Sequence, residues 1–441
     1  MVEVENFKCL KKVSARLAPI TVLIGPNGSG KSSLCQALVL LKQSLGQPKI
    51  LVDGPYLSLG EFEDIVNKEA ESKEISIRVE GEVSLAQAKI LGLDEAVKFQ
   101  YKASFSSEGL AYHETRLNVS PGLLSDQIFH KPQTPSELTK EFRGIWRRGQ
   151  RIGEFARILF DKIAISLTTS NSVGEALILG GFSYPSNMEE LAYNVRRSCE
   201  ELVRAPRTAI ERIFFVPGIR GISQPSLYLW SRLVEDFTTK EGPSEQASRL
   251  ASIFGYRPEV SESVSQWIAQ LAKARIRHRL VPENKISLEI LTPRVIGNIV
   301  NEGLGLNQII FPLAQLAAAQ RGSTVMIEEP ELHLHPKAQG ELVKIFLEIV
   351  KNENKQIIMT THSEHILFRL LVAVAKKQLK PKDLAVHYFE KPSDATASDV
   401  KELGIDEKGR LKEGLPSFFE EDLNEFREYL NALTGGPPNE V

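Results

Sequence analysis

The stretch that most constrains the fold of this chain is residues 18–40, APITVLIGPNGSGKSSLCQALVL. An apolar, β-branched run leads into a glycine-rich turn and then into a helical pattern, which predicts a strand, a loop and a helix in that order. The spacing G-x-x-x-x-G-K-[ST] falls on Gly25, Gly30, Lys31 and Ser32. Such a loop gathers backbone N–H groups around phosphate oxygens, and the helix points its positive end at them. The stretch therefore predicts a phosphate-binding loop in an α/β fold, and its flanking pattern argues against a glycine-rich turn with a chance lysine.

The residue types in this loop suit a nucleoside triphosphate. Lys31 would place a positive charge between the β- and γ-phosphates, and Ser32 would offer its hydroxyl to Mg²⁺, a cation that prefers oxygen ligands. We therefore expect ATP and Mg²⁺ as cofactors. The predicted nucleotide-binding residues of the loop are Asn27, Gly28, Ser29, Gly30, Lys31, Ser32 and Ser33.

A second segment, VMIEEPELHLHP at residues 325–336, places three carboxylates and two imidazoles close together. One interpretation is a metal site with His333 and His335 as ligands. The other is a buried strand that ends in Glu328 and Glu329, at the strand end where open α/β sheets bind ligands. Glu328 would then hold Mg²⁺, through water, and Glu329 would polarise the attacking water. The second interpretation is favoured, because an HxH pair needs further ligands that the sequence does not show.

Together these residues resemble the ATP-binding-cassette (ABC) type ATPases, in the SMC-like and OLD-like branch of soluble ATPases. In that branch EEPExHLHP is a recurring form of the Walker B segment with the loop that follows it. The resemblance implies that residues 333–336 lie in the D-loop region, which faces a partner subunit. It also implies an ATPase whose two copies enclose two ATP molecules.

Two further stretches extend the resemblance. KQIIMTTHSEHILFRLL, residues 355–371, predicts a strand and then a helix, with His362 at the position of the switch histidine that contacts the γ-phosphate; a neighbour of a helix cap is the alternative. NEGLGLNQIIFPLAQLAAAQ, residues 301–320, resembles a degenerate signature motif, and a plain glycine N-cap is its alternative. The signature candidates, facing the nucleotide of the other subunit, are Gly303, Gly305 and Asn307.

Weaker matches lie elsewhere. Residues 56–66 look like the segment near the Q-loop, and residues 214–221, FFVPGIRG, resemble a strand-end motif whose arginine is Arg220. Neither match assigns a chemical role. Residues 384–423 resemble a short C-terminal domain of unknown function that is appended to some of these ATPases.

The predicted fold is α/β: an ABC-type P-loop ATPase lobe with a mixed sheet, an antiparallel β subdomain and a mostly helical insertion. The N-terminal half of the lobe covers residues 1–125, because alternating patterns after the loop helix predict antiparallel strands. Residues 126–290 are predicted to form the insertion. Residues 291–383 return as the second half of the lobe, and residues 384–441 form a short extension.

Composition limits the partners that this chain can have. With 54 basic and 56 acidic residues the formal charge is −2, so any binding to nucleic acid needs a local patch. Three cysteines at unrelated spacings indicate no disulfide framework. The sequence shows no signal peptide and no membrane span, which predicts a cytoplasmic protein without a membrane partner.

Two basic clusters are candidates for double-stranded DNA, although such runs are more often solvated faces or protein-binding surfaces. They are Arg143, Arg147, Arg148 and Arg151, and Lys273, Arg275, Arg277 and Arg279.

The predicted function is ATP binding and hydrolysis, with Glu329, His362 and Lys31 as catalytic residues, in a homodimer or higher homo-oligomer. The resemblance implies that this cycle regulates an effector or a DNA transaction, in anti-phage defence or DNA repair, with any nuclease supplied by a separate protein. The alternative is a slow nucleotide-gated scaffold that holds an assembly together. A membrane-transport subunit is disfavoured by the long insertion and the degenerate signature.

Overall fold

The structure is a computed structural model that describes residues 1–47, 49–83, 97–107, 111–118, 204–230, 242–392 and 395–414. The predicted arginine cluster at 143–151 and the helical patterns at 153–167 and 188–203 lie outside these residues. In the described ranges no helix combines the length and the apolar character that crossing a bilayer requires.

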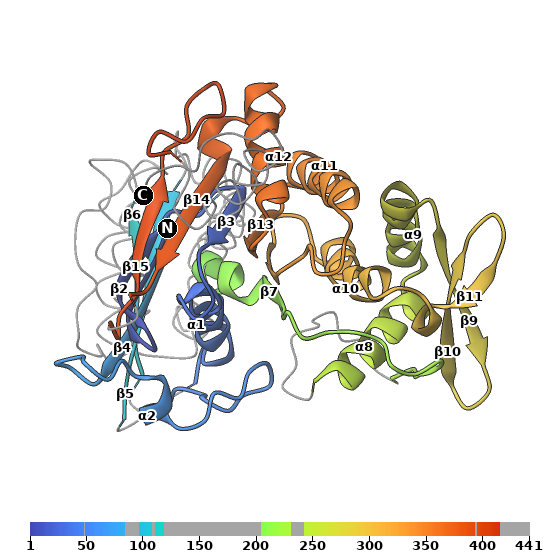
Figure 1. Cartoon of the computed structure of the whole chain (residues 1–441). Helices are drawn as coiled ribbons and strands as arrows, with labels where there is room; N and C mark the ends of the chain where they lie inside the picture. The colour runs from blue at the N-terminus through green and yellow to red at the C-terminus, as the bar shows by residue number, and fades with distance from the viewer. Residues whose placement is uncertain are drawn as a thin grey trace, which may run out of the picture.

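A six-stranded sheet forms the centre of the molecule, in the order β15-β14-β3-β13-β12-β7 (Figure 1). The five strands from β14 to β7 are parallel, and β15 pairs antiparallel with β14 at the edge. The parallel strands are mostly apolar because layers cover both faces of the sheet. The strands are β3 (Ile20–Ile24), β7 (Ile213–Val216), β12 (Thr324–Glu328), β13 (Gln356–Thr360), β14 (Leu384–Glu390) and β15 (Asp399–Leu403).

Two hydrophobic cores lie on opposite faces of this sheet. Alternate residues of one strand point to opposite faces, so Val325 and Ile327 enter one core and Met326 enters the other. Helices that cover the sheet contribute to the first core, and the helix that follows the glycine-rich loop contributes to the second. These helices are α10 (Leu304–Ala318), α11 (Pro336–Glu353) and α12 (Glu364–Ala375) on the first face and α1 (Lys31–Gln43) on the second.

A second sheet is wholly antiparallel, in the order β2-β1-β4-β5-β6, and confirms the predicted β subdomain. Its inner face shares the second core with α1. The short helix α2 (Phe62–Ile65) lies in the segment between the loop helix and this sheet. The strands are β1 (Val2–Phe7), β2 (Leu10–Ala15), β4 (Glu74–Val83), β5 (Val97–Ser106) and β6 (Ala111–Asn118).

The described part of residues 126–290 differs from the expected helical insertion. Helices α8 (Pro243–Tyr256) and α9 (Pro258–Ala272) agree with the helical pattern, but β7 belongs to the central sheet beside β12. The chain therefore returns to that sheet at residue 213, well before 291. A four-residue apolar run such as β7 is too short for periodicity to separate strand from helix.

A third, antiparallel sheet lies beyond α8 and α9, at the end of the molecule away from β14 and β15 (Figure 1). In it β10 pairs with β8, β9 and β11. The basic run at 273–279 lies mostly on β9, where Arg277 and Arg279 both pair with Glu289 of β10. The strands are β8 (Leu227–Tyr228), β9 (Arg275–Val281), β10 (Lys285–Leu291) and β11 (Ile296–Asn298).

The C-terminal extension is also not separate from the lobe. Its first strand, β14, pairs in parallel with β3, the strand that leads into the glycine-rich loop. The boundary at 384 was placed by motif resemblance, which carries no information on strand pairing.

His387 on β14 is expected to make the stability of the protein sensitive to acid. Its ring is 1% exposed, Nε2 lies 2.8 Å from the Arg16 carbonyl oxygen, and Nδ1 has no partner among the described residues. Burial lowers the pKa of His387 below its ordinary value. The unfolded chain therefore takes up a proton near pH 6.5, whereas the folded chain takes it up only at lower pH. The free energy of unfolding consequently falls as pH drops below about 6.5, by up to about 1.4 kcal/mol per pH unit.

The measurement is urea unfolding between pH 5 and 8 of the wild type and of His387→Gln, whose amide can keep the bond to Arg16. The pH slope should be smaller in this variant and unchanged in His365→Gln, at an exposed histidine on α12. Equal slopes in all three proteins would contradict the prediction.

Candidate nucleotide site

The glycine-rich loop joins β3 to α1 as predicted. Gly25 has φ 140°, and a Cβ on it would lie 2.0 Å from the carbonyl oxygen of Phe389 on β14, so only glycine fits. Gly30 is the N-cap of α1 with φ 97°, and no side chain caps the helix. The first N–H groups of α1 are thus left for a ligand. Ser29 is buried, and its Oγ has no hydrogen-bond partner in the described part of the chain.

Lys31 folds back over the loop that it follows. Its side chain is almost wholly buried, and Nζ donates hydrogen bonds to the carbonyl oxygens of Gly25 (2.8 Å) and Pro26 (2.7 Å). Burial lowers the pKa of Lys31 to about 8, against the opposing effect of Glu329 and Glu328. An anion beside Nζ would stabilise its charged form and give it a stronger partner than two carbonyls.

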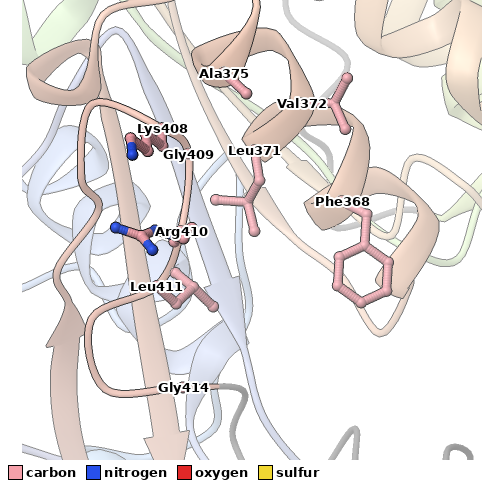
Figure 2. A pocket seen from close by; sticks show the side chains of 9 residues that line it. All are labelled: Phe368, Leu371, Val372, Ala375, Lys408, Gly409, Arg410, Leu411 and Gly414. Atoms are coloured by element: carbon pink, nitrogen blue, oxygen red, sulfur yellow. The ribbon is translucent and has the colours of Figure 1, made fainter.

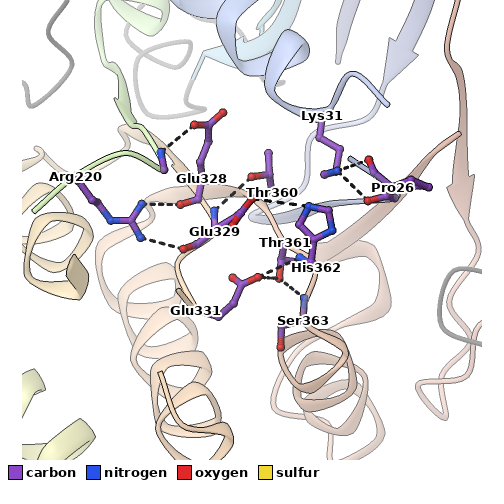
Figure 3. A network of polar contacts seen from close by, with 12 residues as sticks. Pro26, Lys31, Arg220, Glu328, Glu329, Glu331, Thr360, Thr361, His362 and Ser363 are labelled. Carbon is purple, nitrogen blue, oxygen red and sulfur yellow. Dashed lines mark hydrogen bonds and ion pairs between the residues drawn. The ribbon is translucent and has the colours of Figure 1, made fainter. Parts of the chain in front are cut away.

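The two glutamates at the end of β12 are held differently. The carboxylate of Glu328 accepts a hydrogen bond from the Gly218 N–H at 2.9 Å. Glu329 has φ 44°, a conformation that non-glycine residues rarely adopt, and its N–H donates to the Thr360 carbonyl at 2.9 Å. Its carboxylate lies 3.8 Å from His362 Nε2 (Figure 3). Glu329 and His362 thus lie close together, with Lys31 at the same edge of the sheet, while their catalytic roles stay predictions.

His362 is suited to act as an uncharged hydrogen-bond donor. It follows β13, and its ring is partly buried between the glycine-rich loop and Glu329 (Figure 3). Burial and then the charge of Lys31 lower the pKa of His362, while Glu329 opposes them. The ring is therefore neutral at pH 7 and carries one N–H donor.

Glu331 is a site residue that the sequence reasoning did not assign. It is 9% exposed, and its Oε1 accepts from Thr361 Oγ1 at 2.5 Å and from the His362 N–H at 3.0 Å. Burial raises the pKa of Glu331. Its contacts fix the backbone that carries His362. The third carboxylate of the EEPE run was the available signal, but only the structure shows that it points away from Glu329 and toward β13.

Arg220, left without a role by the sequence, connects the loop after β7 to the two glutamates. Its buried guanidinium donates to the carbonyl oxygens of Glu328 (2.7 Å), Glu329 (2.9 Å), Pro217 (2.8 Å) and Gln308 (3.1 Å). Burial lowers the pKa of Arg220 to about 10, so it remains charged at neutral pH. Arg220 therefore sets the backbone that presents Glu328 and Glu329 (Figure 3).

The oxygen atoms at this site decide whether Mg²⁺ fits it. Ser32 and Glu328 offer the hydroxyl and carboxylate oxygens that this cation prefers, which fits. The alternative site at His333 and His335 fits poorly, because His335 Nδ1 accepts from the Lys337 N–H as the N-cap of α11. Within the described ranges no group of three or more His, Cys, Asp or Glu residues is arranged to hold a metal ion.

The signature candidates lie at the start of α10. The contacts of Asn307 and Gly305 are with residues outside the glycine-rich loop. Asn307 is buried, and both ends of its amide bond the backbone of Ile222, at 2.6 and 2.8 Å. The expected phosphate contact of Asn307 is therefore replaced by a structural role. Gly303 is the exposed N-cap of α10, and a Cβ on Gly305 would lie 2.6 Å from the His333 carbonyl oxygen.

Gly305→Ala is expected to push the start of α10 away from the loop at residues 333–336. The added methyl group meets the His333 backbone and not the end of a flexible side chain, so the first turn of α10 must shift. We expect a loss of about 1–3 kcal/mol in the free energy of unfolding. Chemical denaturation measures it, with Gly303→Ala as the control because no atom lies within 4 Å of its added Cβ. Equal stability of the two variants would contradict the close contact.

Comparison with known proteins identifies two family models that match this chain. A family model described as AAA ATPase domain matches residues 1–133 and 239–367, more than half of the chain. A second model, described as a protein of unknown function (DUF3696), matches residues 379–428 and confirms the resemblance of the C-terminal segment.

Individual relatives are more distant. An OLD nuclease of Thermus scotoductus is 23% identical over 366 residues, which are 82% of this chain and 58% of that protein. This chain thus spans little more than half the length of that relative. Over 50 residues, 11% of this chain and 16% of the relative, it is 38% identical to the energy-coupling factor transporter ATP-binding protein EcfA2 of Spiroplasma kunkelii.

Similar solved structures include SMC head domains. The head from Thermotoga maritima aligns over 92% of this chain and 98% of its own, with 13% identity and a TM-score of 0.42. An Smc head with an extended coiled coil from Pyrococcus furiosus aligns over 97% and 98%, with 15% identity and a TM-score of 0.43. The family assignment depends on the family model and on the P-loop, Walker B and switch segments described above. The chain belongs to the AAA ATPase domain family, and its P-loop, Walker B and switch segments resemble those of SMC/OLD-like, ABC-type ATPases.

Proposed function

We propose that this protein binds ATP with Mg²⁺ and hydrolyses it with Glu329 as the general base. One observation carries the proposal: Glu329 and His362 face each other at 3.8 Å, on the same edge of the sheet as Lys31. The charge of Lys31 would bind the β- and γ-phosphates. Glu329 would take the proton of an attacking water, and neutral His362 would donate a hydrogen bond to the γ-phosphate.

The metal contributes charge neutralisation when bound, and Ser32 and Glu328 would hold it. Other residues hold the backbone of these groups in position. Arg220 holds the backbone of Glu328 and Glu329, and Glu331 holds the backbone of His362. Catalysis of this kind is mainly positioning and electrostatic stabilisation, so these supports matter as much as the reacting groups.

We further propose that two copies close around two ATP molecules. Support comes from the start of α10, where Gly303 and Leu304 are exposed and no side chain caps the helix. Open N–H groups at a helix start suit the γ-phosphate held by a second copy. Binding would close the dimer and hydrolysis would open it.

For the cellular role we propose control of a DNA transaction or of an effector protein, in anti-phage defence or DNA repair. Support comes from the relative whose name is OLD nuclease, although this chain spans 58% of its length. A nuclease would then be a separate partner. Double-stranded DNA is proposed as a ligand of this assembly, and the cytoplasm remains the expected location.

The test measures ATP hydrolysis and mass in solution, with and without double-stranded DNA. The matched control is Lys31→Ala, which should lose ATP binding because the buried charge beside the loop is removed. ATP-dependent dimers whose turnover rises with DNA would support the full proposal. Slow turnover that ignores DNA, in a stable larger assembly, would favour the nucleotide-gated scaffold. Unchanged ATP affinity in Lys31→Ala would contradict the nucleotide site itself.

A further inference from the structure

An open apolar cleft of 470 Å³ lies between α12 and the loop of residues 404–414 (Figure 2). Val372, on the helix side of the cleft, is 42% exposed. An apolar wall of this kind loses free energy while water covers it. The cleft is lined by Phe368, Leu371, Val372, Ala375, Lys408, Gly409, Arg410, Leu411 and Gly414.

The loop that forms the second wall is fixed to the helix. Gly409 has φ 72°, and a Cβ on it would lie 2.2 Å from the Leu371 carbonyl oxygen, so the loop and the helix backbones touch. Asp406 accepts hydrogen bonds from the N–H groups of Lys408 and Arg410, both at 2.9 Å. The cleft is therefore a built feature with two fixed walls.

The chain that follows has the pattern of a helix with one apolar face. Ser417 and Glu420 have the spacing of a capping box, and Gly435 with Pro437 forms a stop signal. Between them the apolar residues recur at intervals of four and three, which aligns them on one side of a helix. They are Phe419, Leu423, Phe426, Leu430 and Leu433.

Two observations favour residues 417–434 as the occupant of the cleft: their acidic charge, and their position in the sequence directly after the loop that lines it. Residues 417–434 contain five acidic residues and one basic residue: Glu420, Glu421, Asp422, Glu425 and Glu428 against Arg427. The rim of the cleft carries Lys408 and Arg410, and exposed Lys376 and Lys377 follow α12. Arg410 is paired with Asp406, whereas the three lysines form no salt bridge with other residues that the structure describes. Gly414 lines the cleft itself, so only two residues separate it from Ser417.

We propose that residues 417–434 dock on this cleft within the same chain, as an amphipathic helix whose apolar face covers Val372 and Phe368. This mode, in which a helix lies in an apolar groove, uses anchors spaced three and four residues apart. Helix α12 starts directly after its N-cap Ser363, the neighbour of His362. The docked segment therefore braces the helix that follows the candidate switch histidine.

The test is amide hydrogen exchange on the full chain, read by mass spectrometry. In the wild type, peptides within 417–434 should exchange at least about tenfold more slowly than in Val372→Glu, which places a charge in the cleft. The control His365→Glu changes an exposed residue of α12 that does not line the cleft and should keep the protection. Peptides from β12 and β13 should be unchanged in both variants, which shows that the lobe remains folded.

A second pair of variants tests the segment from its own side. Phe426→Glu lies on the apolar face and should remove the protection, whereas Asn424→Glu lies on the opposite face and should not. Rapid exchange of 417–434 in the wild type, or equal exchange in Val372→Glu and His365→Glu, would overturn the proposal. Protection that is lost on tenfold dilution of the protein would assign the cleft to a second copy and also overturn it.

Discussion

Replacement of Glu329 by Gln should slow ATP hydrolysis by about 10²- to 10⁴-fold while ATP binding persists. Gln has nearly the same shape as Glu but cannot accept a proton, so the loss falls on the chemical step. The backbone contacts of Glu329, to Thr360 and from Arg220, do not involve its carboxylate and should survive. The variant should therefore accumulate in its ATP-bound state, as dimers if the proposed closure is correct.

The measurement pairs single-turnover hydrolysis with nucleotide binding at equilibrium. Glu348→Gln, at an exposed position on α11, is the matched control and should behave as the wild type. Turnover that falls less than tenfold in Glu329→Gln would remove Glu329 from the role of general base. A fall in turnover with an equal fall in affinity would instead indicate a binding role.

Replacement of Arg220 by Met should lower the free energy of unfolding by about 3–5 kcal/mol. Met fills much of the volume but leaves four carbonyl oxygens without their donor, those of Pro217, Gln308, Glu328 and Glu329. The cost of burying unsatisfied polar groups is the physical reason. Because two of these carbonyls belong to Glu328 and Glu329, for which we propose roles in catalysis, hydrolysis should fall as well, even at temperatures where the variant is folded.

Chemical denaturation and turnover of the same preparations separate the two effects. Arg212→Met, at an exposed position just before β7, is the matched control and should change the free energy of unfolding by less than about 0.5 kcal/mol. If Arg220→Met were as stable as Arg212→Met, the hydrogen bonds drawn from Arg220 in Figure 3 would not have the energetic weight that we assign to them.

The nucleotide loop, the Walker B strand and the switch strand were predictable because each is a short local pattern. Gly25 to Ser32, Glu328 with Glu329, and His362 each follow a buried apolar strand, and parallel strands bring their carboxyl ends to one edge. Local pattern was sufficient to predict these strands and the edge that they share, while the roles of the residues at that edge stay predictions.

The misplaced boundaries and the unassigned residues all depend on contacts between distant segments. Nothing within IFFV shows that β7 will pair with β12, and nothing near Leu384 shows that β14 will pair with β3. The structural role of Asn307 likewise depends on Ile222, 85 positions earlier in the chain. Arg220 bonds backbone carbonyls, and Glu331 bonds the His362 N–H and the Thr361 hydroxyl, 30 or more residues away. Such long-range bonds leave no local pattern in the sequence.

The position of β3 between β13 and β14 has a consequence for the synthesis of the protein. The strand that leads into the glycine-rich loop is synthesised well before both of its neighbours, which lie more than 330 residues later in the chain. Such long-range pairing is slow to form and must wait for chain to emerge. A nascent or truncated chain that ends before residue 384 lacks one side of this strand and the Phe389 carbonyl against Gly25. A chain cut before residue 384 should therefore bind nucleotide more weakly than a chain that contains β14, because the support of the glycine-rich loop on that side is missing.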